Sequence, residues 1–219
     1  MLSWIKNRMP RSKEDAGASQ LKQMVADVQS DSGRLSIEDL RPVLIPSSIF
    51  ELGQWVGPYH HFRALPLSLT WAFLRPEQTM LYLDYNAANA FEAEAIDWRS
   101  KARAAAAADF ERQPWTHEYR NDQGGIEAVV MMHEDGLGPS RLMMYSWFTK
   151  QFPQGFSFFV PERSCAFVIA NDASSKIQES VQTAVHGCFA AADVPMSESA
   201  FDHTLLKQAL HDAREDAGV

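Results

Sequence analysis

The sequence predicts an α+β fold: a mostly antiparallel sheet built from three successive strand–strand–helix units, with the helices on one face. Two β-rich runs followed by a helical segment recur three times, starting near residues 70, 115 and 156. In each unit a few turn-forming residues separate the two runs, which is typical of a β-hairpin. Hairpins joined by helices build an antiparallel or mixed sheet more simply than a parallel one. We therefore expect all three units to share a single sheet.

The first unit begins with two β-rich runs, residues 70–74 (TWAFL) and 79–84 (TMLYLD). A helix over residues 97–112 is expected next. Asp97 suits its first position because an aspartate side chain accepts hydrogen bonds from the first free backbone amides of a helix. The segment 102–108 contains six alanines, and alanine is the strongest helix former.

The second unit pairs the runs 115–120 and 126–132 across the turn-forming residues 121–125 (NDQGG). A helix over residues 142–150 follows. Pro139 fits a first helical position, where its missing N–H costs no hydrogen bond.

The third unit pairs the runs 156–160 (FSFFV) and 165–170 (CAFVIA). Ser175 and Gln178 have the spacing of a capping box, in which each side chain bonds to the other residue's free amide. They predict the start of a helix that reaches about residue 191.

Three segments complete the predicted organisation: a flexible N-terminal segment (1–19), a single α+β domain (20–214) and a disordered tail (215–219). At the start of the domain, apolar residues at helical spacing predict an amphipathic helix over residues 21–28. A last helix is expected over residues 199–214.

The segment between these helices and the first unit is rich in helix breakers. Ser36 is expected to open a short helical turn, which Pro42 ends because proline lacks the N–H that a helix needs. Residues 43–69 contain several further prolines and glycines. They are expected to be irregular, with short extended or helical pieces.

Composition and charge exclude several classes of protein. The 219 residues include 20 basic and 28 acidic side chains, which gives a net charge of −8 and argues against nucleic-acid binding. There is neither a run of about 18 apolar residues nor a secretory signal, so no membrane association is expected. Two cysteines are too few for a disulfide framework, which favours a cytoplasmic location.

Sequence motifs for cofactors, metals and common nucleophiles are missing. The chain has no phosphate-binding loop, no dinucleotide-binding glycine pattern and no nucleophile elbow. It also has neither of the strongest zinc spacings. We therefore expect no cofactor and no metal.

Catalysis would need a site assembled from distant residues, and the second hairpin offers the best candidates. Glu127 and His133 are an even number of residues apart, so one strand presents both on the same face. Together with His117 they would form a small-molecule site on an uncovered face of the sheet.

The two cysteines are expected to be structural. Cys165 opens a β-rich run, and Cys188 lies on the apolar stripe of a predicted helix. His186 is two residues from Cys188, a spacing that separates side chains on a helix. A cysteine–histidine nucleophile is therefore not indicated.

One segment has an unusual density of aromatic residues, with seven among residues 145–159, and two pairs of methionines, 131–132 and 143–144, come shortly before it in the chain. Aromatic residues dominate domain interiors, so core packing is one interpretation. The other is an exposed surface for a protein partner or a second copy of the chain, since methionine suits adaptable contacts. The candidate partner-binding residues are Met143, Met144, Trp147, Phe148 and Phe152.

The order of segments resembles the YtpQ-like bacterial family of unknown function. The resemblance covers about residues 36–205 and rests on RPVL near the start, the strand pair TWAFLRPEQTMLYLD, the double glycine before IEAVVMM, and FSFFVPERSCAFVIAND before a helix. It implies a cytosolic α+β protein with no established activity and adds no catalytic residue.

These observations favour a bacterial, cytoplasmic, non-enzymatic module that binds a protein partner, such as an immunity protein, an antitoxin or a chaperone. The acidic balance suits a basic partner, because complementary charge accelerates encounter. The alternative is an enzyme with a small-molecule site around His117, Glu127 and His133.

Overall fold

The computed structural model describes residues 35–53, 55–75 and 80–217. The chain divides into two units between Leu35 and Ser36, and the account below concerns Ser36–Val219. The expected helix over residues 21–28 and the N-terminal segment 1–19 lie outside the described residues.

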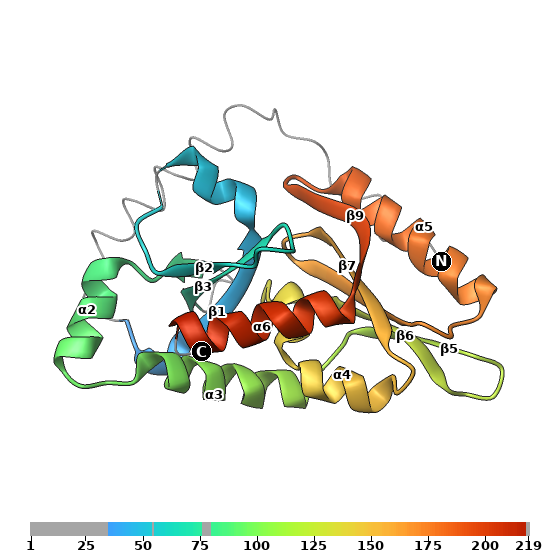
Figure 1. Cartoon of the computed structure of the whole chain (residues 1–219), viewed down its shortest axis with the longest axis horizontal. Helices are drawn as coiled ribbons and strands as arrows, with labels where there is room; N and C mark the ends of the chain where they lie inside the picture. The colour runs from blue at the N-terminus through green and yellow to red at the C-terminus, as the bar shows by residue number, and fades with distance from the viewer. Residues whose placement is uncertain (1–34, 54, 76–79, 218–219) are drawn as a thin grey trace. The chain divides into compact units, whose positions relative to one another are not determined.

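Sheet A is built around a central strand, β3 (Leu67–Leu74). On one side β3 pairs with β1 (Leu40–Pro46) along its whole length. On the other side it pairs first with β2 (Tyr59–His61) and then with β4 (Met80–Tyr82). All three pairings are antiparallel (Figure 1).

Sheet B contains five strands, all antiparallel to their neighbours. Its order is β5 (His117–Arg120), β6 (Ile126–Met132), β8 (Cys165–Ala170), β7 (Phe156–Glu162) and β9 (Pro195–Asp202). All residues of β8 are buried, so this central strand is covered on both faces.

Two α-helices, α2 (Tyr85–Ala93) and α3 (Trp98–Arg112), follow sheet A in the chain. As predicted, the Asp97 side chain caps α3 by accepting a hydrogen bond from a backbone amide of its first turn. Trp98 is buried edge-on against Trp71 of β3, with ring centroids 5.1 Å apart. α3 lies along β1 (Figure 1) and is held there by this apolar contact and by others near its end.

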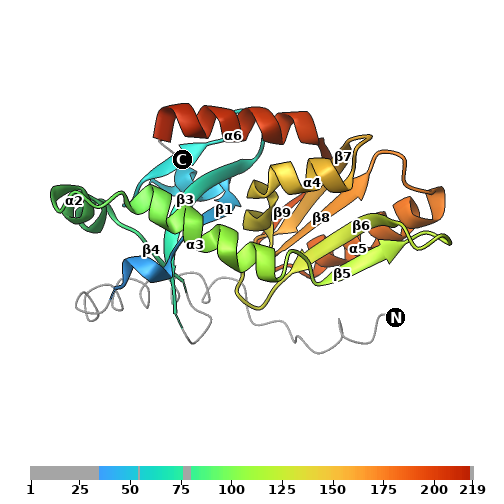
Figure 2. The same ribbon diagram turned by 90° about the horizontal axis from the view of Figure 1, so that it is seen from below.

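The helices of sheet B lie on opposite faces of it. α4 (Tyr145–Gln151) packs through Phe148, whose ring centroid is 5.8 Å from that of Phe156 in β7. α5 (Ser175–Ala191) packs on the other face (Figure 2), and the side chain of Cys165 in β8 points toward it.

Short 3-10 helices complete the connections. η2 (Ile37–Asp39) precedes β1, with the Ser36 side chain as its cap, and η3 (Ser47–Leu52) follows β1. η4 (Pro139–Met143) leads into α4 and has proline at its first position, as the sequence predicts.

The structure confirms the α+β class and the antiparallel pairing, but two further expectations were wrong. The strand pairs of the three units do not share a single sheet, because the first belongs to sheet A and the other two to sheet B. The helices are not all on one face, because β8 is central in sheet B and its apolar side chains need cover on both sides.

Residues 43–69 contain short extended and helical pieces as expected, β2 and η3, but they also contain most of β1, which was not predicted. The prolines of this region misled the prediction. Pro42 and Pro46 lie in β1, which is an edge strand of sheet A. An edge strand tolerates proline because one side of it needs no backbone donor.

The C-terminal prediction was wrong at both ends of the helix. Residues 199–202 belong to β9, and α6 (His203–Ala217) begins only after Asp202. The Asp202 side chain accepts a hydrogen bond from the Thr204 amide at 2.8 Å, which fixes this start. The helix continues to Ala217, so regular backbone extends past residue 214, where the tail was expected to begin.

Candidate functional site

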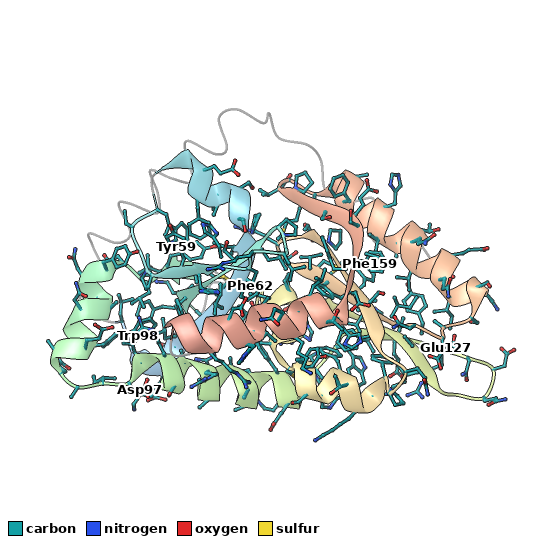
Figure 3. All side chains as sticks on the ribbon, in the orientation of Figure 1. Tyr59, Phe62, Asp97, Trp98, Glu127 and Phe159 are labelled. Atoms are coloured by element: carbon teal, nitrogen blue, oxygen red, sulfur yellow. The ribbon has the colours of Figure 1, made fainter. Side chains whose placement is uncertain are left out.

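Glu127 stands at the start of β6 and joins the second hairpin to the beginning of α5 (Figure 3). Its carboxylate accepts hydrogen bonds from the backbone amide and the hydroxyl of Ser174, at 2.9 and 2.8 Å. A third bond comes from the Asn121 side chain at 3.1 Å. These donors, the Ser174 amide first, lower the pKa of Glu127. The carboxylate is thus engaged in holding two elements together.

The three candidate catalytic residues do not come together. His117 is opposite Val130, so it shares a face of sheet B with Val130, while Glu127 and His133 share the other face. Glu127 and His133 are six residues apart along an extended segment, which is roughly 20 Å. His117 is exposed and His133 is buried, so the structure does not form the predicted small-molecule site.

His133 lies in a second polar site, which the sequence does not reveal. Its side chain is 7% exposed, and its Nε2 is 3.0 Å from the carbonyl oxygen of Gln113. Because that oxygen only accepts, Nε2 carries the proton and Nδ1 is left as a buried acceptor without a partner. Burial first, and then the positive charge of Arg141, lower the pKa of His133 to about 4. The imidazole is therefore neutral at pH 7.

Arg141 is the centre of this polar site, and its side chain is 3% exposed. Two of its nitrogens donate to the two oxygens of Asp135, at 3.2 and 2.9 Å, and Nε donates to the Gln113 carbonyl at 3.1 Å. The guanidinium also lies 4.8 Å from the ring centroid of Phe110. Such a fork of charge-assisted bonds satisfies a buried arginine. Arg141 therefore connects the end of α3 to the segment after β6.

An open cavity of about 500 Å³ lies beside this arginine. Its lining includes Asp109 and Arg112 of α3, which pair with each other, and Asp109 also binds Arg41 at 2.8 Å. Partial burial opposes ionisation of Asp109, but hydrogen bonds from Arg41 and Arg112 hold its pKa below the usual range. The volume would admit a small molecule. However, these charged side chains already form ion pairs within the protein, so they have little capacity left to bind a ligand.

The predicted partner-binding residues are mostly core residues. Phe148 and Phe152 are 0% and 2% exposed, so they cannot form a contact surface. Met143 and Met144 are half-buried and pack against the core of sheet A. Trp147 is half-buried against Trp115, with ring centroids 4.6 Å apart. The aromatic and methionine-rich segment therefore serves mainly to join α4 to the interior.

A different apolar surface, the aromatic face, lies on sheet A around β2 and the start of α2. Of the four large apolar side chains that are exposed among the described residues, three are here: Val56 (67%), Tyr59 (42%) and Tyr85 (50%). The Tyr85 amide donates to the Val56 carbonyl at 3.0 Å, which keeps the two residues side by side. We define the aromatic face by these three exposed residues together with Phe50, Trp55 and Tyr82, which are half-buried and pack against the core of sheet A.

Ring contacts hold the aromatic face in one arrangement (Figure 3 labels Tyr59). The ring centroid of Phe50 is 4.2 Å from that of Tyr59 and 4.9 Å from that of Trp55. Trp55 in turn meets Tyr82 at 4.8 Å. Tyr59 and Tyr82 pair with alternate residues of β3, so both point to the same face of sheet A.

Within the described ranges, no three histidine, cysteine, aspartate or glutamate side chains are grouped so that they could hold a metal ion. In the same part of the chain, no helix has the length and apolar character needed to cross a membrane.

Comparison of the whole chain with protein-family models, curated proteins and solved structures found no match. The resemblance to the YtpQ-like family stays a prediction from the sequence. The candidate site therefore depends on geometry alone.

Proposed function

We propose that the chain is a protein-binding module and that the aromatic face is its contact surface. The observation that supports this is the grouping of Val56, Tyr59 and Tyr85, three of the four exposed large apolar side chains of the described residues. Single exposed apolar residues are ordinary, whereas a contiguous group favours an interaction site.

The chemistry of the aromatic face suits protein recognition. Tyrosine and tryptophan are enriched at the centres of interfaces, because each buries a large area and keeps a polar group for orientation. Contacts of Phe50 with Tyr59 and Trp55 restrict these rings before any partner arrives. Less side-chain entropy is then lost on binding.

The partner is expected to be basic. The chain carries eight more acidic than basic side chains, since it has 28 of one and 20 of the other. Long-range attraction would accelerate the encounter with a basic protein, while the aromatic face would supply the short-range contact. An immunity protein, an antitoxin or a chaperone would each fit these two features. A second copy of the chain is the alternative occupant, at the cost of like-charge repulsion.

The test compares two variants of the full chain. Tyr59→Thr/Tyr85→Ser removes two exposed rings, and Val194→Ser removes the fourth exposed apolar residue, which lies elsewhere. Val194→Ser changes an exposed side chain and is expected to keep its stability within about 0.5 kcal/mol. The double variant also loses the Phe50–Tyr59 ring contact, so it is expected to be destabilised by about 1 kcal/mol while staying folded. We expect the double variant to lose at least about tenfold in partner affinity, which corresponds to about 1.4 kcal/mol.

Quantitative cross-linking and capture from the native cells, at low and high salt, would identify the proteins that bind the wild type and Val194→Ser equally but not the double variant. Sedimentation at rising concentration would detect self-association, and its loss in the double variant would identify a second copy as the partner. If the captured proteins and the sedimentation are the same for all three proteins, the aromatic face is not a binding surface.

A further inference from the structure

The only two cysteines of the 219-residue chain meet across the interface between α5 and β8. Cys165 is completely buried at the start of β8, and Cys188 is half-buried near the end of α5. Their thiols lie within hydrogen-bonding reach of each other. Two residues that are far apart in sequence and come from different elements are thus in side-chain contact.

Shared neighbours define this thiol site further. Tyr119 of β5 and Glu162 of β7 each interact electrostatically with both thiols. The register agrees, because Cys165 pairs with Met132 and Tyr119 pairs with Ala128, so both cysteine and tyrosine face the side of sheet B that α5 covers. His186, by contrast, bonds to Glu198 at 2.6 Å on the exposed side of α5. The thiol site therefore consists of two neighbouring sulfurs, with a phenol and a carboxylate near enough to act on them electrostatically.

We propose that Cys165 and Cys188 form a reversible disulfide when the protein meets a peroxide. The contact between the thiols supplies the geometry, since two cysteines can be bridged without backbone movement only when their side chains already approach. The proposal is independent of the aromatic face. Cys188 would then react with peroxide, although its position on the apolar stripe of a helix predicts a structural role.

The two thiols have different roles in the reaction. The hydrogen bond with Cys165 lowers the pKa of Cys188, and the same bond together with burial raises the pKa of Cys165 well above its usual value. Cys188 is also the more exposed of the two. A thiolate is the attacking species, so Cys188 reacts first and Cys165 resolves the product.

The steps balance with hydrogen peroxide as the oxidant. The Cys188 thiolate attacks one peroxide oxygen, the O–O bond breaks, and the leaving hydroxide takes a proton to become water, which leaves a sulfenic acid. The Cys165 sulfur then attacks the Cys188 sulfur. The S–O bond breaks, and the departing hydroxide takes the Cys165 proton to form a second water. Overall, two thiols and one peroxide give one disulfide and two waters.

Peptide mapping of the full chain after peroxide treatment tests the proposal. We expect both thiols to be lost together, the intact mass to fall by two hydrogens, and a peptide pair linking Cys165 to Cys188 to appear and to be released by dithiothreitol. The linked form should also unfold at a higher urea concentration, because the bond restricts the unfolded chain. The same treatment of protein unfolded in urea is the control, and the link should form at least about tenfold more slowly there, because the fold no longer holds the sulfurs together.

Two variants separate the roles of the sulfurs. In Cys165→Ser, the sulfenic acid on Cys188 should persist and be trapped by dimedone. In Cys188→Ser, the buried Cys165 should stay reduced. The wild-type map decides the question even if a variant fails to fold. Retention of both thiols in native protein, or oxidation of Cys188 to a sulfinic acid beside a free Cys165, would overturn the proposal.

Discussion

Replacing Gly138 with alanine is expected to destabilise the protein by about 3 kcal/mol or more. Gly138 precedes η4, and an added Cβ would overlap the backbone carbonyl oxygens of Met131 in β6 and Ser164 in the turn between β7 and β8. Both obstacles are main chain within or next to sheet B, so no flexible side chain can move aside. Urea denaturation followed by circular dichroism would measure the loss as a lower midpoint.

A glycine in open surroundings provides the matched control. Gly187 lies inside α5, and a Cβ built there would meet nothing within 4 Å. Gly187→Ala is therefore expected to stabilise the protein by about 0.5–1 kcal/mol, because alanine favours the helix more than glycine does. The two substitutions add the same methyl group and should move the midpoint in opposite directions. Equal midpoints for Gly138→Ala and wild type would show that the main chain around Gly138 is not closed as described.

Local signals were sufficient to predict the hairpins and the helices that follow them. The pair β7–β8 occurs where the runs 156–160 and 165–170 placed it. The helix α5 starts at Ser175 as expected. However, the predicted capping box does not form, because the cap is Ser174 and the Gln178 side chain donates to the Ala173 carbonyl. In these units each strand finds a partner only a few residues away in sequence. Turn residues and capping residues are therefore enough to predict where such strands and helices begin and end.

Strands with distant partners were missed for the opposite reason. Leu40 of β1 pairs with Phe73 of β3, and Ser157 of β7 pairs with Asp202 of β9. No local pattern specifies such a pairing, and Pro42 was interpreted only as the end of a short helical turn. The number of sheets follows from these long-range pairings, which explains why a single sheet was expected.

The aromatic face and the polar site around Arg141 were even harder to predict from the sequence. Tyr59 and Tyr82 share a face only because β2 and β4 pair with successive parts of β3. Nothing in the local sequence distinguishes Arg141 from an ordinary charged residue. Its partners are separated by the whole second hairpin, because Gln113 precedes β5 and Asp135 follows β6. The density of aromatic rings in residues 145–159 was the more conspicuous feature of the sequence. These rings belong mainly to the core, because α4 packs over Phe156.

Acidification from pH 7 to pH 4 is expected to destabilise the wild type by about 3 kcal/mol through His133 alone. The pKa of His133 is lowered from 6.5 to about 4 in the folded protein, by burial and by the nearby Arg141 guanidinium. In the unfolded chain the imidazole takes up a proton below pH 6.5, whereas in the fold it stays neutral until about pH 4. The stability that His133 contributes is therefore complete above pH 6.5 and is lost as the pH falls toward 4.

A difference measurement isolates this effect, because other groups of the protein also change their protonation in acid. His133→Gln removes the titrating group and keeps a side-chain N–H that can donate to the Gln113 carbonyl, as Nε2 does at 3.0 Å in the wild type. Between pH 6.5 and 4 the free energy of unfolding of the wild type should fall more steeply than that of the variant, by up to about 1.4 kcal/mol per pH unit. Parallel pH profiles for the two proteins would mean that His133 is protonated as readily in the fold as in water. The buried Nδ1 without a partner would then have to be reached by solvent, and the polar site around Arg141 would be open rather than closed.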